Sequence, residues 1–525
     1  MLKASGAMAA ATMTSRLLGM VREIVYAQFM GDTWVAGVFK FAFQIPNLFR
    51  RLLGEGALTA AFIPLFKEKE KIHGEDEMWR AANAVISGLI VAASVIVGLV
   101  MLGISIALAA HDFLPKTELM LQLLRVMFPY MLLVCLAAAF MGMLNARGHF
   151  FIPAMGAAAL NVVMIASVLW LAPLFGTDLP KDLRLPKQIF ALAYGVLAAG
   201  VALAAFQLPT LWRDGFRCRW VSPWHDETVR LVVTRMIPGT IGIAAYQINV
   251  TLVQFLAVWI NPQINASFDY AVRLMELPQG MFGISLATYL LPTLAGLAAE
   301  KNFPEYRATL RQGLGALLFA NLIASVLLVV LAEPIVRLIF EHGKFTAAST
   351  GRATLALACL APGLVAFSTV NVLARAFYAL GDVKTPMKIS LFCFAVNLIF
   401  AVALVRPLRQ GGLGIANTVT SLCNVGFLLY ALRRKLGKLE MEPLRATLLP
   451  LAGAGILAGL AAWWGCRLWE NTMGHAALFQ KVGAVFVPAA AAGLIYFLAT
   501  VALKIPAAKE MADLVFQIFR GQQQQ

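Results

Sequence analysis

The sequence predicts an all-α polytopic membrane protein with fourteen transmembrane helices. Hydrophobic residues make up 60% of the 525-residue chain, and the mean hydropathy is +0.77. Apolar runs of about twenty residues, the length needed to cross a bilayer, recur from one end to the other. No long polar linker separates these runs. A soluble globular domain is only about half apolar, so lipid is expected to surround much of this surface.

Each predicted helix is an apolar run bounded by charged or turn-rich residues. The first is expected to remain in the mature protein, because Arg16, Arg22 and Glu23 interrupt the uncharged core that a cleaved signal peptide needs. Basic residues concentrate in alternate loops, most clearly at 213–219 and 433–438, which predicts that both termini are cytoplasmic. The predicted helices are 4–30, 33–66, 80–110, 120–146, 151–175, 188–212, 228–260, 265–298, 309–340, 351–380, 386–406, 411–432, 446–468 and 479–504.

Matching proline spacings indicate an internal repeat. The stretches 129–153 and 362–386 each run from proline to proline through a helix, a small turn and the start of the next helix. A similar offset relates 45–64 to 277–292. Carriers built from two parallel repeats bind their substrate between the halves. The predicted domains are an N-lobe of six helices at 1–220, a C-lobe of six helices at 221–440, and two C-terminal helices with a short tail at 441–525.

Charged residues inside the first, second and eighth predicted helices are the strongest functional signal. Each costs about 2.5 to 3.5 kcal/mol to insert, so each needs a partner or a hydrated cavity. These helices belong to both halves, and most of their cations are arginine, whose planar guanidinium suits phosphate. We therefore expect a cationic cavity between the lobes. The residues are Arg16, Arg22, Glu23, Lys40, Arg50, Arg51, Glu55, Asp269, Arg273 and Glu276.

The same charges also have a structural interpretation, in which they pair with one another or reach the membrane surface. That interpretation is favoured for Glu333 with Arg337 and for Arg375. The six cysteines and six histidines lack metal-ligand or disulfide spacing, so no metal site is predicted. No GxxxxGK[ST] phosphate loop or catalytic motif is found, which favours a carrier over an enzyme.

Five segments resemble the MurJ (MviN) family of lipid II flippases, in the multidrug/oligosaccharidyl-lipid/polysaccharide exporter superfamily. This resemblance implies two six-helix lobes around a cationic cavity, and two final helices that form a hydrophobic groove for a polyprenyl tail. It also implies transport of an undecaprenyl-pyrophosphate-linked disaccharide pentapeptide from the cytoplasmic to the periplasmic leaflet by alternating access. The segments are SRLLGMVREIVYAQFMG (15–31), FQIPNLFRRLLGEGALTAAFIPLF (43–66), YAVRLMELPQGMFG (270–283), EHGKFT (341–346) and GDVKTPMK (381–388).

The resemblance also suggests site residues. It implies substrate binding by Arg16, Arg22, Arg50 and Arg273, with Glu23, Glu55, Asp269 and Glu276 in gating or supporting roles. The chain departs from the family at Gly37 and Val272, where relatives often carry aspartates, and Asp269 or Glu23 is our hypothesis for the replacement partner of Arg273. No cofactor is expected. Coupling to the membrane potential, Na⁺ or H⁺ stays open, and the oxygens available for Na⁺ are on Asn249, Asn397, Thr418 and Thr420.

The predicted partners are lipid II and membrane lipids, with no nucleic acid, and the expected unit is a monomer in the bacterial inner membrane. Three other functions stay open. A flippase for another polyprenyl-linked saccharide would use the same arginines. A cation-coupled multidrug exporter would favour an acidic or apolar cavity. A scaffold protein would use the charges only to lock its helices together.

Overall fold

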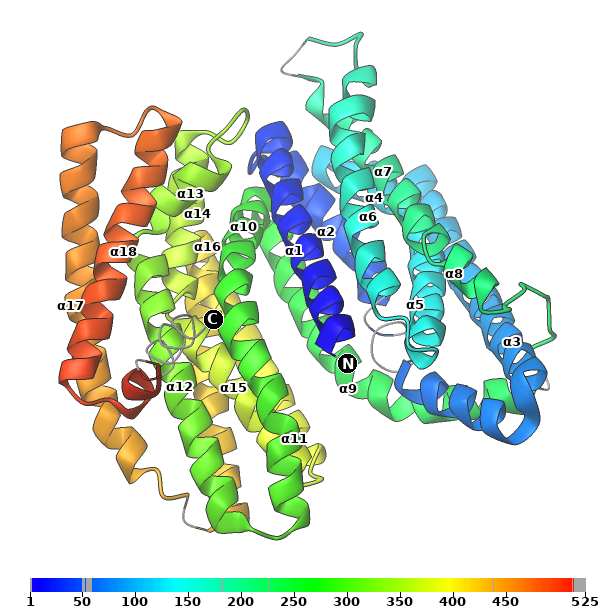
Figure 1. Ribbon diagram of the computed structural model, residues 1–525. Helices are drawn as coiled ribbons and strands as arrows, with labels where there is room; N and C mark the ends of the chain where they lie inside the picture. Colours follow the sequence, from blue (N-terminus) through cyan, green and yellow to red (C-terminus); the bar gives the residue numbers. More distant parts are fainter. Residues whose placement is uncertain are drawn as a thin grey trace. The chain divides into compact units, whose positions relative to one another are not determined.

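The computed structural model describes residues 2–49, 52, 59–180, 183–224, 226–437, 439–511 and 513, and within these ranges all regular elements are helical (Figure 1). Contacts divide the chain into two compact units, Met1–Ala266 and Ser267–Gln525. The three predicted domains, with limits at 220 and 440, remain a prediction. Each unit is built on apolar clusters of its own.

In the first unit, α1 packs on α6, α2 packs on α4, and α3 packs on α5 and α9. The end of α6 continues as a π turn and a 3₁₀ turn, Ser167–Leu171 and Ala172–Leu174. The helices are α1 Leu2–Met30, α2 Trp34–Phe49, α3 Thr59–Ala110, α4 Pro115–Met127, α5 Tyr130–Ala146, α6 Phe151–Ala166, α7 Leu185–Ala205, α8 Leu208–Arg213 and α9 Glu227–Ile260.

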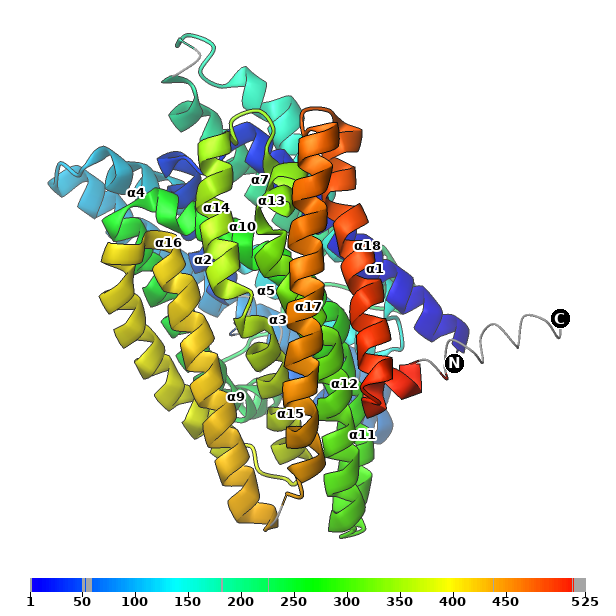
Figure 2. The same cartoon turned by 90° about the vertical axis from the view of Figure 1, so that its left-hand side faces the viewer.

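In the second unit, α17 and α18 form a hairpin, and α17 packs along α12 (Figures 1 and 2). Helix α10, Pro262–Pro278, starts in the first unit and continues in the second, where the π turn Gln279–Ile284 follows it. The other helices are α11 Ser285–Ala299, α12 Phe303–Val330, α13 Ala332–Phe340, α14 Ala347–Leu360, α15 Gly363–Ala379, α16 Lys384–Leu436, α17 Glu442–Met473 and α18 Leu478–Ala502.

The two units share a bend at equivalent prolines. Helices α4 and α5 meet at 41° around Pro129, and α14 and α15 meet at 47° around Pro362. Proline lacks an N–H and its ring crowds the preceding turn, so a break at each site is expected. The same bend in corresponding places supports the internal repeat that proline spacing predicts.

The predicted loop between the second and third helices is wrong. The predicted loop at 67–79 is helical, because α3 starts at Thr59 and is broken only at Gly74, where φ is +86°. Glu and Lys are good helix formers, and the pairs Lys67–Glu70 and Glu77–Arg80 add support at i,i+3 spacing. The predicted helix 33–66 includes α2 and the first residues of α3, and most of the residues between Phe49 and Thr59 lie outside the described part of the chain.

The protein crosses the membrane several times. Within the described residues, eight helices are long and apolar enough to span a bilayer, or up to ten if each bent pair is one span. Helix α16 comprises the two predicted helices 386–406 and 411–432. Arg409 is non-helical there, and Gly412 returns to pack against Leu404. The full count of fourteen stays a prediction, as does the arrangement in two six-helix lobes.

Candidate functional site

A buried ionic cluster joins α1 and α2 in the first unit. The Arg22 guanidinium donates to Glu23 Oε1 at 2.7 Å, and Lys40 Nζ of α2 lies 3.8 Å from Glu23 Oε2. Their side chains are only 15%, 6% and 9% exposed, in the order Arg22, Glu23, Lys40. Two cations therefore share one carboxylate inside a membrane protein, where uncompensated charge is costly. Lys40, which the sequence analysis counted among the charged residues of the expected cavity but did not assign to binding or gating, belongs to this cluster.

Arg22 is held in place by two further contacts. It donates to Asn161 Oδ1 of α6 at 3.0 Å, and Asn161 Nδ2 donates in turn to the Ser15 carbonyl of α1 at 3.2 Å. The guanidinium carbon also lies 5.6 Å from the centre of the Tyr26 ring, one turn along α1, in a cation–π arrangement. These contacts fix the direction of the guanidinium, so the group is oriented before any ligand arrives.

A cavity of about 250 Å³ opens beside Arg22 within the first unit. Its polar lining includes Asn161 and Gln207, and Gln207 is 1% exposed. The Gln207 amide donates to the Ala137 and Leu203 carbonyls, while its Oε1 has no hydrogen-bond partner among the described residues. An acceptor buried this way suits a water molecule or a ligand donor. Asn161 and Gln207 were missed by the sequence analysis, although each is a polar residue inside an apolar run.

The remaining first-unit candidates have different outcomes. Arg16 lies on α1 and is exposed. Arg50 and Glu55 lie outside the described residues. Gly37, where relatives often carry an aspartate, has a structural explanation: a Cβ there would lie 1.9 Å from the Pro262 carbonyl oxygen. Asn265 also donates to the Gly37 carbonyl at 3.1 Å, so the backbone between α9 and α10 occupies the space of a side chain.

The second unit carries its own cluster on α10. Arg273 donates to Glu276 Oε2 at 3.0 Å and lies 3.8 Å from Asp269 Oδ1. The side chains of Asp269, Arg273 and Glu276 are 16%, 34% and 49% exposed. Arg273 and Glu276 are three residues apart, a spacing that places them on one face of a helix. Asp269, the hypothetical replacement for the missing family aspartate at Val272, is in contact with Arg273.

An apolar groove runs between α12 and α17 in the second unit, with a volume of about 680 Å³. Glycines allow the close approach of its two walls: a Cβ at Gly459 would lie 3.0 Å from Val326, and one at Gly455 would lie 3.3 Å from Leu322. Leu460 and Trp463 also line it and are exposed. An apolar surface that is open along a helix pair suits a hydrocarbon chain.

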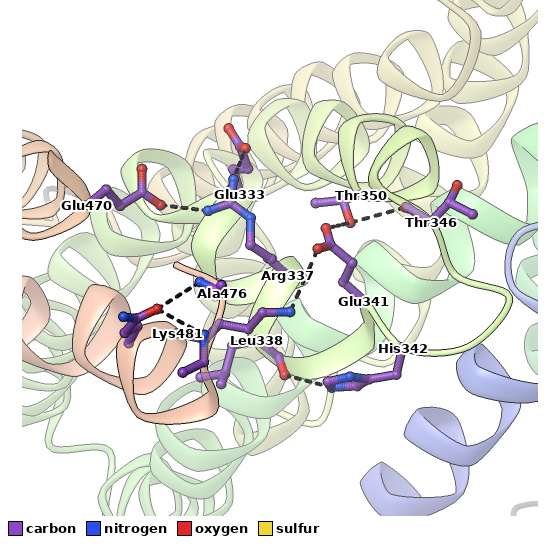
Figure 3. Close-up of polar contacts among 12 residues, drawn as sticks. Glu333, Arg337, Leu338, Glu341, His342, Thr346, Thr350, Glu470, Ala476 and Lys481 are labelled. Atoms are coloured by element: carbon purple, nitrogen blue, oxygen red, sulfur yellow. Dashed lines mark hydrogen bonds and ion pairs between the residues drawn. The ribbon is translucent and has the colours of Figure 1, made fainter. Parts of the chain in front are cut away.

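The hairpin that forms one wall of this groove is held at one end by ion pairs (Figure 3). Arg337 of α13 bonds to Glu333 and to Glu470 of α17, the latter at 2.6 Å, and its side chain is 12% exposed. Lys481 of α18 lies 3.7 Å from Glu341, which also accepts from Thr350 at 2.6 Å. The structural interpretation of Glu333 and Arg337 is thus supported: they attach the hairpin to α13.

The possible Na⁺ ligands are asparagine and threonine oxygens, and no carboxylate has been assigned to them. In the described part of the chain, no group of three or more His, Cys, Asp or Glu residues is placed to hold a metal. The Thr418 hydroxyl donates to the Cys359 carbonyl at 3.1 Å. Asn397 and Thr420 are buried in α16. A Na⁺ site stays a prediction.

These features define a multi-pass helical membrane carrier with buried cations in one unit and an apolar groove in the other. The lipid II flippase MurJ family model matches residues 26–482, and the chain belongs to this family. A relative from Rhizobium tropici named probable lipid II flippase MurJ is 32% identical over 498 residues, which cover 93% of this chain and 91% of the relative.

Solved structures show the same fold. A structure of the lipid II flippase MurJ in an inward closed conformation matches with a TM-score of 0.75 at 21% identity, over 94% of this chain and 98% of that one. An inward-facing multidrug resistance MATE family transporter of the MOP superfamily matches with a TM-score of 0.63 at 14% identity, over 83% of this chain and 99% of that one. The predicted family is confirmed.

Proposed function

We propose that this chain is a lipid II flippase, which moves the undecaprenyl-pyrophosphate-linked peptidoglycan precursor from the cytoplasmic to the periplasmic leaflet. Membership of the MurJ family along most of the chain is the observation that carries this proposal. The arrangement is fourteen helices in two lobes and a C-terminal pair, with both termini in the cytoplasm of a bacterial inner-membrane protein. The working unit is a monomer.

Arg22 is the central ligand of the pyrophosphate, together with Arg16, Arg50 and Arg273. Its support is the contact set around the guanidinium: Asn161 and Tyr26 orient it, and Glu23 is shared with Lys40. A charge-assisted hydrogen bond from an oriented guanidinium to phosphate is among the stronger polar contacts in proteins. A hydrated path lets the head group cross without the full cost of burying its polar groups in lipid.

The apolar groove between α12 and α17 holds the polyprenyl tail. The groove is open and lined by side chains such as Val326, Ile456 and Leu460. A tail that stays in apolar surroundings throughout transport loses no favourable burial. The ion pairs of Arg337 and Lys481 keep the α17–α18 hairpin in place while the tail occupies the groove.

The acids next to the arginines act as exchange partners during alternating access. When phosphate binds Arg22, Glu23 keeps Lys40 as its partner, so no carboxylate is left alone. On α10 the balance is reversed: Arg273 lies between Asp269 and Glu276, and these acids pair with it again when it releases the phosphate, as Glu55 does in the second helix. After the substrate has left, the carrier with its empty cationic cavity resets to the inward-open conformation, driven by the membrane potential, Na⁺ or H⁺.

A cation-coupled multidrug exporter is the second candidate, because the MATE carriers share this fold. An exporter of organic cations requires acidic or apolar binding surfaces. The buried Arg22 and Lys40 around a single Glu23 oppose that requirement. A flippase for another polyprenyl-pyrophosphate saccharide would use the same cations, and only transport measurements separate it from a lipid II flippase.

The test is complementation in a bacterium whose own lipid II flippase is depleted. We expect the wild type to restore growth, while Arg22→Ala and Arg50→Ala do not, at equal membrane levels on a blot. Arg433→Ala is the matched control, because that arginine is exposed near the end of α16. If well-inserted wild type fails to restore growth, the lipid II assignment is wrong. If all variants restore it, the arginines serve only structure.

A further inference from the structure

The connection between α8 and α9 combines exposed tryptophans with exposed arginines. Trp212, Trp220 and Trp224 are 50%, 64% and 72% exposed. Arg213 and Arg219, among the arginines of the same stretch, are exposed as well. Tryptophan concentrates where membrane meets water, because its ring is apolar and its N–H is polar. Nothing in the transport cycle proposed above uses these residues.

This connection is held firmly against the middle of α3, beyond the break at Gly74. Asn83, which is 3% exposed, donates from Nδ2 to the Arg217 carbonyl at 2.9 Å and accepts from the Arg219 N–H at 3.0 Å. Ser87 accepts from the Val221 N–H at 3.3 Å. Phe216 is fully buried. The backbone is therefore anchored by buried polar groups, and the neighbouring tryptophan and arginine side chains face outward from a fixed support.

The length of α3 places this connection at the membrane surface. From Ala81 to Ala110 the helix is free of charged residues, a run of about thirty residues. At 1.5 Å per residue the run is about 45 Å long, whereas the hydrocarbon core is about 30 Å thick. About the first ten residues thus extend beyond the core if the far end lies at the opposite interface. Asn83 and Ser87 are among them, so the attached connection lies at head-group depth.

The charge exposed on this surface is basic. Of the three acids near it, Asp214 lies 3.0 Å from His149 Nε2, Asp226 caps α9 and lies 3.6 Å from Arg80, and Glu227 is exposed, so the exposed arginines outnumber the exposed acid. Arg230 and Arg235, on the first turns of α9, add two exposed cations. Arginine pairs with phosphate oxygens through two parallel hydrogen bonds. The combination fits a phosphodiester head group with its acyl chains beside the tryptophans.

We propose that residues 212–224, together with Arg230 and Arg235 of α9, form a binding site for anionic phospholipids of the leaflet that they face. Its arginines bind the head-group phosphates, and Trp220 and Trp224 insert at the boundary with the acyl chains. The site holds one end of α3, α8 and α9 at a fixed membrane depth. Sequence predicts this leaflet to be the cytoplasmic one.

The test compares two variants that each lose two positive charges. Arg213→Gln/Arg219→Gln removes them from the proposed site, and Arg433→Gln/Arg434→Gln removes them from exposed positions at the end of α16. The purified full chain in neutral detergent is titrated with phosphatidylglycerol or phosphatidylcholine, and bound lipid is counted by native mass spectrometry. Each basic residue near an anionic membrane surface strengthens attraction by about fivefold.

We expect phosphatidylglycerol binding to weaken by about 30-fold in the first variant, with phosphatidylcholine binding unchanged. The control variant should change by less than about threefold. Equal losses in both variants would show only general charge attraction and would overturn the site. Unchanged binding in the first variant would also overturn it.

A second measurement locates the tryptophans. In vesicles containing brominated phosphatidylglycerol, fluorescence quenching should fall from wild type to Trp220→Phe/Trp224→Phe, because those rings contact the lipid directly. The matched pair is Trp463→Phe/Trp464→Phe on α17, whose rings are also exposed; their loss should reduce quenching by brominated phosphatidylcholine as much as by the anionic lipid. Absence of any quenching from Trp220 and Trp224 would place the connection away from the membrane, as a protein-binding surface would be, and would reject the proposal.

Discussion

The ionic clusters on α1–α2 and on α10 have opposite charge balances. In the first unit, Arg22 and Lys40 share Glu23, whereas in the second unit Arg273 lies between Asp269 and Glu276. The first cluster is also the more deeply buried, with side-chain exposures of 15% or less against 16% to 49%. An arginine in a transmembrane helix therefore does not by itself indicate an anion-binding group. The number of acids around the arginine and the burial of its side chain determine whether it can bind an anion.

Burial increases the importance of the difference. Charge interactions strengthen as the local dielectric falls, so a phosphate that reaches the buried Arg22 and Lys40 gains more from them than it would at an exposed site. The α10 cluster has more acid than base and more solvent, so it gains less from a phosphate. We infer that α1–α2 supplies most of the affinity for the substrate, and that Arg273 on α10 supplies less and also forms an ion pair that can open and close.

Loss of the Arg22 guanidinium should have the largest effect. Arg22→Ala removes charged hydrogen bonds worth about 1.5 to 3 kcal/mol each, so transport of lipid II in proteoliposomes should fall by about 10- to 150-fold. The transport rate of Arg22→Lys should lie between those of the wild type and Arg22→Ala, because lysine keeps the charge and loses the planar pair of donors. Full transport by Arg22→Ala would remove the distinction between the two clusters.

The second-largest effect is expected from Gly37→Ala, a steric change near Lys40. Gly37 lies one turn before Lys40, and a Cβ at that position would clash with the Pro262 carbonyl. Gly37→Ala should destabilise the protein by about 1 to 3 kcal/mol through overpacking and should loosen the Lys40–Glu23 contact. The measurement is the melting temperature of the purified chain together with its transport rate.

Gly98→Ala on α3 is the matched control for that substitution, because nothing lies within 4 Å of the added carbon. It should be neutral or slightly stabilising. Equal behaviour of Gly37→Ala and Gly98→Ala would show that the approach of Pro262 does not constrain α2.

The α10 cluster should be more tolerant. Because Arg273 is one-third exposed, breaking its pairs should cost about 0 to 1 kcal/mol, and Arg273→Gln should lower transport by no more than about fivefold. Exchange of charges in Asp269→Arg/Arg273→Asp should restore part of the lost activity, since the pair is rebuilt in reverse. A loss as large as that of Arg22→Ala, with no restoration by the exchange, would show that Arg273 contributes as much to substrate binding as Arg22 does.

Sequence patterns predicted the parts of the molecule that depend on composition and local chemistry. The apolar spans follow from composition, and the family follows from the resemblance of five segments. The bends at Pro129 and Pro362 were not predicted, because the sequence analysis placed continuous helices at 120–146 and 351–380. Other missed features depend on contacts between residues distant in the sequence. Asn161 is 139 residues from Arg22, and no periodicity connects them.

The roles of Gly37 and Lys40 were missed for the same reason. A glycine required by a passing carbonyl group has no local signature, and Lys40 becomes part of the site only when α2 packs beside α1. The helical segment 67–79 of α3 was missed for a different reason: its charged residues were interpreted as a loop, although Lys and Glu at i,i+3 spacing also stabilise a surface helix.

A second comparison concerns the turns that follow the bent pairs. The offset that places Pro129 on Pro362 also places His149 on Asp382. His149 Nε2 lies 3.0 Å from Asp214, just after α8, and Asp382 lies 2.7 Å from Lys435 near the end of α16. Each unit thus links this turn to the end of a later helix by a contact between a basic and an acidic side chain. In the first unit the turn supplies the histidine and the later segment the acid, whereas in the second unit the turn supplies the acid and the later helix the lysine.

The smallest expected effect tests this link in the second unit. The hydrogen bond from Lys435 to Asp382 lowers the pKa of Asp382 from 3.8 to about 2. A depressed carboxyl pKa means that the link stabilises the folded protein at neutral pH and is lost as the pH falls from about 3.8 to about 2. For a partly exposed pair the contribution is below about 1 kcal/mol, so Asp382→Asn should lower the melting temperature by about 1 °C at pH 7. The gap between wild type and variant should close across that acid range. A gap that stays constant to pH 2 would show that the Asp382 charge does not hold the turn, and that its hydrogen bonds with Thr385 are sufficient.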